Sequence, residues 1–172
     1  MKMKVALFLL IAFLFGCSPT LINVPLNIPI IQESTINVVV KNGSLDQQIY
    51  LIEFGFGGTS HIHMLNLQPT IEIALGNLIK EKLISHKSLA SFSRIEVTIE
   101  KLELKNKVGT AKNDEILCEI ESNLHVPPIS SDKKVQTFSK NIENMSPFIA
   151  TAANIILMQC LQQHASKIVD ML

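Results

Sequence analysis

The chain has 172 residues, with 15 Lys and Arg balanced by 15 Asp and Glu, no Trp and one Tyr. The balanced charge excludes the basic surface field that nucleic-acid-binding domains present. Hydrophobic residues make up 47% of the chain, which excludes a disordered chain and is enough for the core of one domain.

The N-terminal segment has the layout of an export signal. Lys2 and Lys4 precede an unbroken apolar run, Val5–Phe15. This run of 11 residues is shorter than the roughly 20 residues that a membrane-spanning helix needs. It therefore predicts the hydrophobic region of a signal peptide and not a transmembrane anchor.

The apolar run ends in Leu14-Phe15-Gly16-Cys17, which resembles the lipobox of bacterial lipoproteins. The resemblance implies that residues 1–16 are a signal peptide that is removed. It also implies that the thiol of Cys17 receives a diacylglycerol and that the new amino terminus is acylated, for example with palmitate. Two or more acyl chains anchor a protein stably, since each buried methylene contributes about 0.8 kcal/mol. An ordinary signal peptide with an incidental cysteine is the alternative.

The residue after Cys17 predicts where the protein is sorted. It is Ser18 and not an aspartate, and in enterobacteria-like sorting this directs a lipoprotein to the outer membrane. Removal of residues 1–16 leaves a net charge of −2, so electrostatic capture by anionic lipid is not expected. We therefore expect a lipid-anchored outer-membrane protein that faces the periplasm.

Residues 17–33 contain three prolines, Pro19, Pro25 and Pro29, among apolar residues. Proline removes an amide donor and biases its neighbours toward extended conformations. The segment therefore predicts the lipidated cysteine followed by an extended tether, partly docked on the domain, with a disordered spacer as the alternative. A single periplasmic domain is expected over residues 34–172.

The predicted elements of this domain follow from hydrophobic periodicity. In the strand that begins at Arg94, the apolar set changes phase after Ile99, which predicts a bulge near Glu100–Lys101. In chain order we expect strands at 36–40 and 48–54, a loop at 55–66, a helix at 68–86 with Pro69 in its first turn, strands at 94–105, 115–126 and 134–142, and a helix from 147 to the C-terminus.

This order, β(β)-α-β-β-β-α, predicts an α+β domain in which two helices pack on one face of a mostly antiparallel sheet. Together with the lipobox and the Pro-containing tether, it resembles the YajG-like family of bacterial outer-membrane lipoproteins. It is also similar in layout to the small transport-auxiliary lipoproteins of the envelope. The resemblance implies an accessory domain that faces the periplasm and is held at the outer membrane by its lipid, with no catalytic residues to transfer.

Cys118 and Cys160 are the two cysteines besides Cys17, and both fall on predicted apolar faces. In the oxidising periplasm a disulfide between them would stabilise the fold by about 3–4 kcal/mol in the loop-entropy model. Two buried, unpaired cysteines that act as small hydrophobes are the alternative. Because the sequence does not give their Cα–Cα distance, both interpretations stay open.

His61 and His63 form a His-x-His pair, and an extended pair of this kind can bind zinc or copper. A metal site normally needs three or four ligands, and no nearby acidic residue completes the set. Surface histidines that flank an inward Ile62 are therefore the preferred interpretation, and we expect no metal.

The patterns that typically indicate an enzyme are missing. Residues 55–58 are glycine-rich but lack the Lys-Ser/Thr of a phosphate-binding loop, and the sequence has no Gly-x-Ser-x-Gly elbow. Glu96, Glu119 and Glu121 alternate with apolar residues, so they are expected on the solvated side of the sheet. We expect neither catalysis nor a cofactor.

The expected function is that of a non-catalytic accessory or assembly subunit in the cell envelope. Its partners would be the membrane, through the acyl chains, and an envelope protein complex, but no nucleic acid. The candidate binding surfaces are the exposed side of the sheet and the apolar tether, Leu21–Ile31. The alternative function is a periplasmic lipid- or glycolipid-binding module with an apolar groove between helices and sheet; a metal-binding protein is a weaker alternative.

Overall fold

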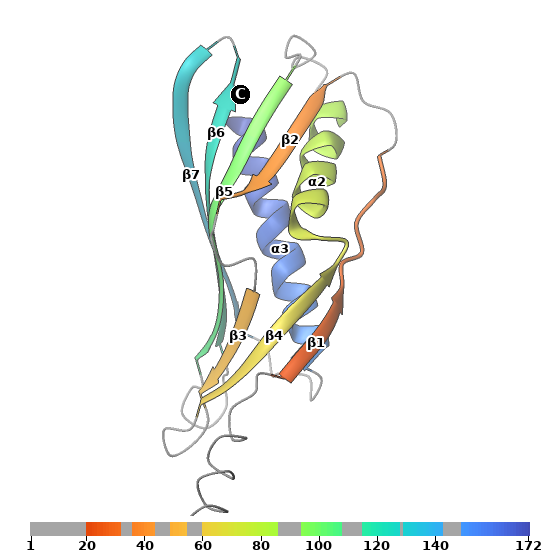
Figure 1. Cartoon of the computed structure of the whole chain (residues 1–172), viewed down its shortest axis with the longest axis vertical. Helices are drawn as coiled ribbons and strands as arrows, with labels where there is room; N and C mark the ends of the chain where they lie inside the picture. The colour runs from red at the N-terminus through yellow and green to blue at the C-terminus, as the bar shows by residue number, and fades with distance from the viewer. Residues whose placement is uncertain are drawn as a thin grey trace, which may run out of the picture.

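The computed structural model describes residues 20–31, 36–43, 49–54, 60–85, 94–107, 115–127, 129–142 and 149–172. These residues form seven strands and two helices around one core (Figure 1). In chain order the elements are β1 Thr20–Pro25, β2 Asn37–Asn42, β3 Ile49–Phe54, β4 Ser60–Gln68, α2 Ile71–Ser85, β5 Arg94–Lys107, β6 Glu115–Val126, β7 Ile129–Ile142 and α3 Ile149–Asp170.

The strands form one mixed sheet with the order β1-β4-β3-β5-β6-β7. The long antiparallel meander β5-β6-β7 contributes most of the paired residues. On the other side of β5, β2 pairs with its first half and β3 with its second half, both in parallel. The predicted α+β class and mostly antiparallel sheet are thus confirmed.

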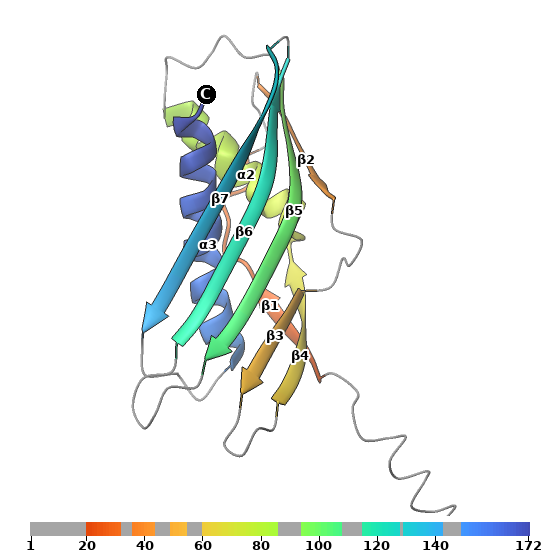
Figure 2. The same cartoon turned by 90° about the vertical axis from the view of Figure 1, so that its left-hand side faces the viewer.

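Both helices lie on the same face of the sheet, as predicted (Figure 2). Helix α3 packs against β6, β7 and β1, whereas α2 packs against β2 and α3. The side chains between these layers are apolar and enclosed. The largest fully buried ones are Leu75, Leu78, Ile79, Ile95, Ile99, Leu104, Ile120, Leu124, Ile156, Leu157 and Leu161.

The predicted bulge in β5 is also confirmed. The register with β6 shifts between Ile99 and Lys101, which inserts one extra residue in β5. The insertion lets Ile99 and Leu104, which have opposite sequence parity, both point into the core with 2% and 1% exposure.

The prediction of a loop up to Asn66 was wrong, because residues 60–68 form strand β4. Histidine and asparagine lower the strand propensity of this segment, but β4 lies between β1 and β3 and pairs with both. Pairing on two sides therefore overrides a weak local preference. The buried side chains of Leu65 and Leu67 alternate with the exposed Asn66, as in a strand with one covered face.

Two predicted boundaries also differ from the structure. Helix α2 begins at Ile71, so Pro69 lies before the helix, joined to Gln68 by a cis peptide bond. Strand β7 begins at Ile129, five residues before its predicted start at 134, and includes Ser130, Ser131 and Asp132. Pairing of Ile129 with Val126 of β6 extends the ladder almost to the turn and outweighs the low strand propensity of these residues.

The predicted tether is in part an integral strand of the sheet. Residues Thr20–Pro25 form β1, which pairs in parallel with β4 at one edge of the sheet. Val24 is fully buried and Leu26 is 5% exposed, so burial of the apolar residues explains why this segment docks. Within the described residues 20–31, Thr20–Pro25 is thus a strand and Leu26 is packed, whereas Ile30 is 81% exposed.

Candidate functional site

The proposed lipid-attachment residue, Cys17, and the predicted signal peptide, residues 1–16, lie outside the described residues. The first described residue is Thr20, which is also the first residue of β1. Ser18 and Pro19 are therefore the only residues between the predicted anchor and the sheet. Within the described part of the chain, neither helix has the length and apolarity of a membrane span.

Strand β1 is held on the domain by side-chain hydrogen bonds as well as by its backbone pairing with β4. The Asn66 side-chain amide donates to the Asn23 side-chain oxygen at 2.8 Å, and the side-chain amide of Asn154 on α3 donates to the carbonyl of Pro25. One residue further, the Leu26 amide donates to the Gln68 carbonyl at 2.7 Å. The segment that follows the anchor is thus held by both β4 and α3.

Cys118 of β6 and Cys160 of α3 form a disulfide in the structure. Their Cα atoms are 6.2 Å apart, within the range that a disulfide spans. Both residues are buried, with 1% and 0% exposure. Of the two interpretations that the sequence leaves open, the structure has the bridged one, which ties α3 to β6.

A buried polar cluster, formed by His164, Ser122 and Thr137, lies beside this disulfide in the α3–sheet interface. The Nε2 atom of His164 is 2.8 Å from the Ser122 hydroxyl, and its Nδ1 atom is 2.9 Å from the Thr137 hydroxyl. All three residues are 0% exposed. Burial lowers the pKa of His164 to about 4, with a further contribution from the nearby Lys167. The ring is therefore neutral at physiological pH and joins α3 to both β6 and β7.

The pairing of Ser122 with His164 is also the first contact of a serine-nucleophile site. Here, however, both residues are completely enclosed, so no substrate reaches the hydroxyl in this conformation. The sequence predicts His164 on the apolar face of the last helix but does not indicate its partners. The available signal was a polar residue at an inward position of each strand, Ser122 between Ile120 and Leu124 and Thr137 after Val135.

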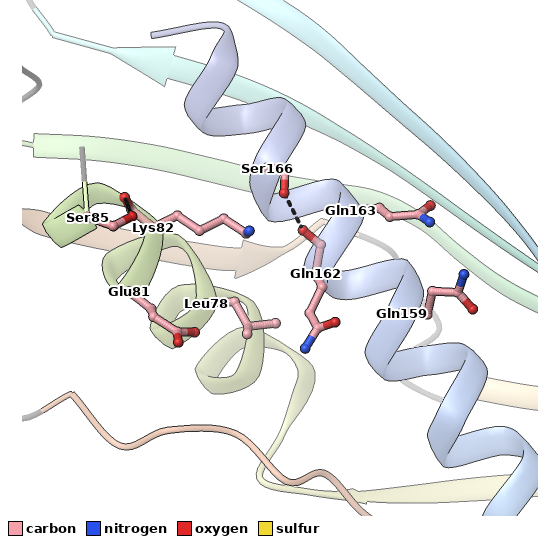
Figure 3. A pocket seen from close by; sticks show the side chains of 8 residues that line it. All are labelled: Leu78, Glu81, Lys82, Ser85, Gln159, Gln162, Gln163 and Ser166. Atoms are coloured by element: carbon pink, nitrogen blue, oxygen red, sulfur yellow. Dashed lines mark hydrogen bonds between the residues drawn. The ribbon is translucent and has the colours of Figure 1, made fainter.

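A groove of about 570 Å³ runs between α2 and α3 on the surface (Figure 3). Apart from Leu78 of α2, its lining is polar, with hydroxyl, amide and charged side chains from both helices: Glu81, Lys82, Ser85, Gln159, Gln162, Gln163 and Ser166. Such a lining offers hydrogen bonds from both helices. This groove therefore lacks the Leu, Ile and Met lining that the lipid-binding alternative expects.

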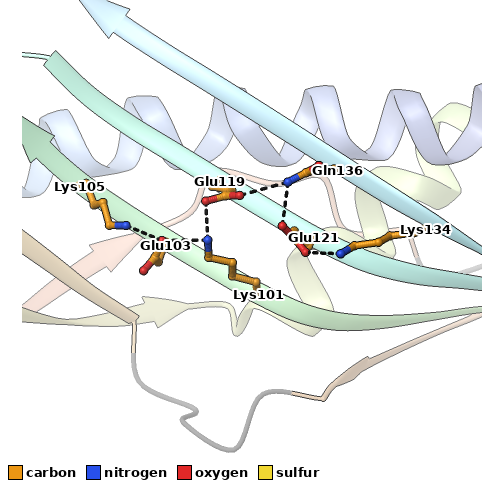
Figure 4. Close-up of polar contacts among 7 residues, drawn as sticks. All are labelled: Lys101, Glu103, Lys105, Glu119, Glu121, Lys134 and Gln136. Atoms are coloured by element: carbon orange, nitrogen blue, oxygen red, sulfur yellow. Dashed lines mark hydrogen bonds and ion pairs between the residues drawn. The ribbon is translucent and has the colours of Figure 1, made fainter.

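The face of the sheet opposite the helices carries a ladder of charged and polar side chains across β5, β6 and β7 (Figure 4). Lys101 lies 2.6 Å from Glu119 and 3.1 Å from Glu103. The Gln136 amide donates to Glu119 and Glu121. Two further ion pairs, Lys105–Glu103 at 2.8 Å and Lys134–Glu121 at 2.7 Å, complete the ladder.

Each charge in the ladder is compensated by a neighbour. The hydrogen bond from Lys101 to Glu119 raises the pKa of Lys101, and Lys105 lowers the pKa of Glu103. Lys134 likewise lowers the pKa of Glu121. The expectation that Glu96, Glu119 and Glu121 lie away from the core is confirmed, since their side chains are 25%, 20% and 17% exposed and form ion pairs on this face.

The same face also exposes two apolar side chains, Phe138 at 63% and Leu117 at 37%. Phe138 lies directly opposite Glu119 in the ladder of β6 and β7. Strand β7 is the edge of the sheet, and Lys167 covers it by donating to the Gln136 carbonyl at 2.9 Å. Lysines at the edge of a sheet discourage pairing with another sheet. The outer face of the sheet is therefore more accessible to a partner than the β7 edge.

His61 and His63 both lie in β4. His63 is half-buried and lies opposite Thr20 of β1, whereas the side chain of His61 is outside the described part of the structure. Among the described residues, no group of three or more His, Cys, Asp and Glu side chains is placed to hold a metal ion.

No protein-family model matches the chain, and no curated protein matches it. Among solved structures, it is similar to protein XCC0632 from Xanthomonas campestris, of the family DUF330, with 12% sequence identity and a TM-score of 0.48 over 87% of this chain and 92% of that one. It is also similar to an uncharacterized protein, with 8% identity and a TM-score of 0.49 over 90% of this chain and 100% of that one. Neither likeness bears on residue roles, ligands or partners.

Proposed function

We propose that this chain is a lipid-anchored lipoprotein of the bacterial outer membrane that acts by binding, as an accessory or assembly subunit of an envelope complex. The observation that carries the proposal is Leu14-Phe15-Gly16-Cys17 directly after a short apolar run. The resemblance to the YajG-like family, and the layout shared with transport-auxiliary lipoproteins, supports the same role. The Cys118–Cys160 disulfide adds support, since such bonds persist in oxidising compartments such as the periplasm.

The arrangement of the polar groups favours binding over catalysis. In the described part of the chain, the ladder charges on the outer face are paired with one another. The enclosed His164 lies between two hydroxyls. An active site needs titratable groups that converge on an open cleft, and these groups serve structural contacts instead.

A protein partner is a better match than an apolar ligand. The space between helices and sheet is filled by side chains with little or no exposure, and the groove between α2 and α3 is polar. By contrast, the outer face of the sheet carries no covering layer among the described residues and exposes Phe138. Exposed aromatic side chains are frequent anchors of protein interfaces.

Membrane fractionation with radiolabelled palmitate tests the anchor. The wild-type protein should take up label and sediment with the outer membrane, whereas Cys17→Ala should remain unlabelled, either as a precursor or released from the membrane. The double variant Cys118→Ala/Cys160→Ala is the matched control, because it removes the other two cysteines and should still be labelled. A processed, labelled Cys17→Ala protein would overturn the assignment.

In-cell cross-linking followed by gentle solubilisation tests the binding role. The wild-type protein should bring down one envelope protein in stoichiometric amount, and Phe138→Ser should weaken that capture. Ile84→Ser is the matched control, because Ile84 has a similar exposure of 57% but lies on α2, on the helical side. If lipid co-purifies and no protein does, the lipid-binding alternative replaces the accessory-subunit role.

A further inference from the structure

The position of the first residue of β1 determines how the domain is oriented relative to the membrane. We infer that the end of the domain where β1 begins is pressed against the bilayer surface and that the opposite end points away from it. The inference deepens the proposed function and rests on its lipid anchor at Cys17. The surface that this end of the domain contacts is the interfacial region of a phospholipid bilayer.

The length of chain outside the structure sets the first constraint. From Cys17 to Thr20 the chain has three residue steps, which span at most about 11 Å when fully extended. A free tether up to residue 33 would allow roughly 55 Å over its 16 steps. Because β1 is paired with β4, the segment between Cys17 and the domain could become longer only if β1 separated from β4.

Leaving β4 would be costly, since β1 is both paired and buried. Val24 is fully buried, and the side chains of Asn66 and Asn154 donate hydrogen bonds to the strand. Moving the buried Val24 side chain into water is unfavourable even before any hydrogen bond is lost. The acyl chains therefore hold this end of the domain close to the headgroups.

Two of the elements at this end, β1 and the start of α3, are uncharged, whereas the ends of β3, β5 and β6 at the same end (Figure 2) carry Glu53, Lys105, Lys107 and Glu115. Strand β1 and the first helical turns of α3 lie together here (Figures 1 and 2). Strand β1 has no ionisable side chain, and α3 has none between Ile149 and Gln159. Leu21 and Ile155 nonetheless expose 55% and 48% of their surface. Uncharged elements with exposed aliphatic side chains meet a lipid interface without desolvating a charge.

The opposite end has a different character. Helix α2 ends there with Lys80, Glu81 and Lys82 in its last two turns, and the C-terminus lies at the same end of the domain (Figure 1). Helix α3 has 22 residues, so at 1.5 Å per residue it separates the two ends by about 33 Å. The charged end of the helix layer is thus held roughly that far from the membrane.

Hydrogen exchange at a chemically attached anchor tests the orientation. The chain from Cys17 to Leu172 contains every described residue, and Cys118 and Cys160 are bridged, so a maleimide-functionalised diacyl lipid couples at Cys17. The coupled protein is placed on vesicles of phosphatidylethanolamine and phosphatidylglycerol, and the control carries N-ethylmaleimide in place of the lipid. Amide exchange is then followed by mass spectrometry.

We expect a several-fold slowing of exchange in residues 20–25 and 149–155 on vesicles, with none in residues 80–85. Leu21→Ser should lose part of the slowing, whereas Ile84→Ser, which changes an equally exposed side chain at the far end, should keep it. Equal slowing at both ends, or none at either, would overturn the inference. Since the lipid is attached chemically, these outcomes are separate from palmitate uptake in cells, which tests the proposed function.

Discussion

The imidazole Nε2 of His164 lies 2.8 Å from the hydroxyl oxygen of Ser122, 42 residues away in the sequence. With Thr137 at 2.9 Å on the other ring nitrogen, the contact places a polar junction where α3 meets two strands of the sheet. A neutral imidazole has one donor and one acceptor nitrogen, so two hydroxyls satisfy both. Protonation makes both nitrogens donors and places a charge in the core.

Acidification should therefore destabilise the fold through His164. Its folded pKa of about 4 lies below the unfolded value of about 6.5, so the unfolded chain binds the proton more readily between these values. The stabilising contribution is complete above pH 6.5 and falls by up to about 3 kcal/mol as the pH drops to about 4.

Urea unfolding at several pH values measures this effect. Glu103 and Glu121 also have lowered pKa values, so they weaken the fold in acid in the same direction. His164→Gln isolates the histidine, because the amide can still hydrogen-bond but does not titrate. If the wild-type and variant curves have the same slope between pH 6.5 and 4, the histidine has no such role.

Removing one hydroxyl of the cluster should also cost stability. Thr137→Val keeps the shape of the side chain but leaves Nδ1 of His164 without its partner, and an unsatisfied buried polar atom costs about 1–3 kcal/mol. Equilibrium unfolding of the variant at neutral pH measures the loss. An unchanged midpoint would mean that the hydroxyl contributes nothing.

The disulfide between Cys118 and Cys160 should also stabilise the fold. Thiol labelling of denatured, unreduced chain from Cys17 to Leu172 should find one reactive thiol, that of Cys17, and reduction should reveal two more. Replacing Cys118 and Cys160 by alanine should lower the free energy of unfolding by about 3–4 kcal/mol. Three free thiols without reduction would contradict the bridge.

The charge ladder on the outer face should contribute less to the free energy of unfolding than the disulfide does. Lys101 is 38% exposed at its side chain, although it contacts both Glu103 and Glu119. Exposed ion pairs are typically worth less than about 1 kcal/mol, so Lys101→Met should change the unfolding free energy by no more than that. A larger loss, insensitive to salt, would show that the ladder is a structural element of the fold.

The sequence was most informative where one face of an element is buried and the other face is exposed to solvent. The alternation around Cys118 predicted both bounds of β6, and the phase change after Ile99 predicted the bulge in β5. Local patterns were sufficient there because side-chain direction follows directly from the two-residue period of a strand.

Contacts between distant segments account for what the sequence did not predict. Strands β1 and β4 become strands by pairing with each other, and the residues that pair, such as Val24 and Leu67, lie more than 40 positions apart. The partners of His164 were missed for the same reason, because a lone serine or threonine in a strand does not indicate which helix residue it will meet. Cys17, by contrast, is proposed from a local motif alone.

The measurement that tests the central claim most directly is the intact mass of the protein purified from cell membranes, with fragmentation of its N-terminus. The account predicts a chain that begins at Cys17, with a diacylglyceryl group on the thiol and an acyl chain on the amine. A chain that retains residues 1–16, or one with an unmodified Cys17 thiol, would contradict the lipoprotein assignment.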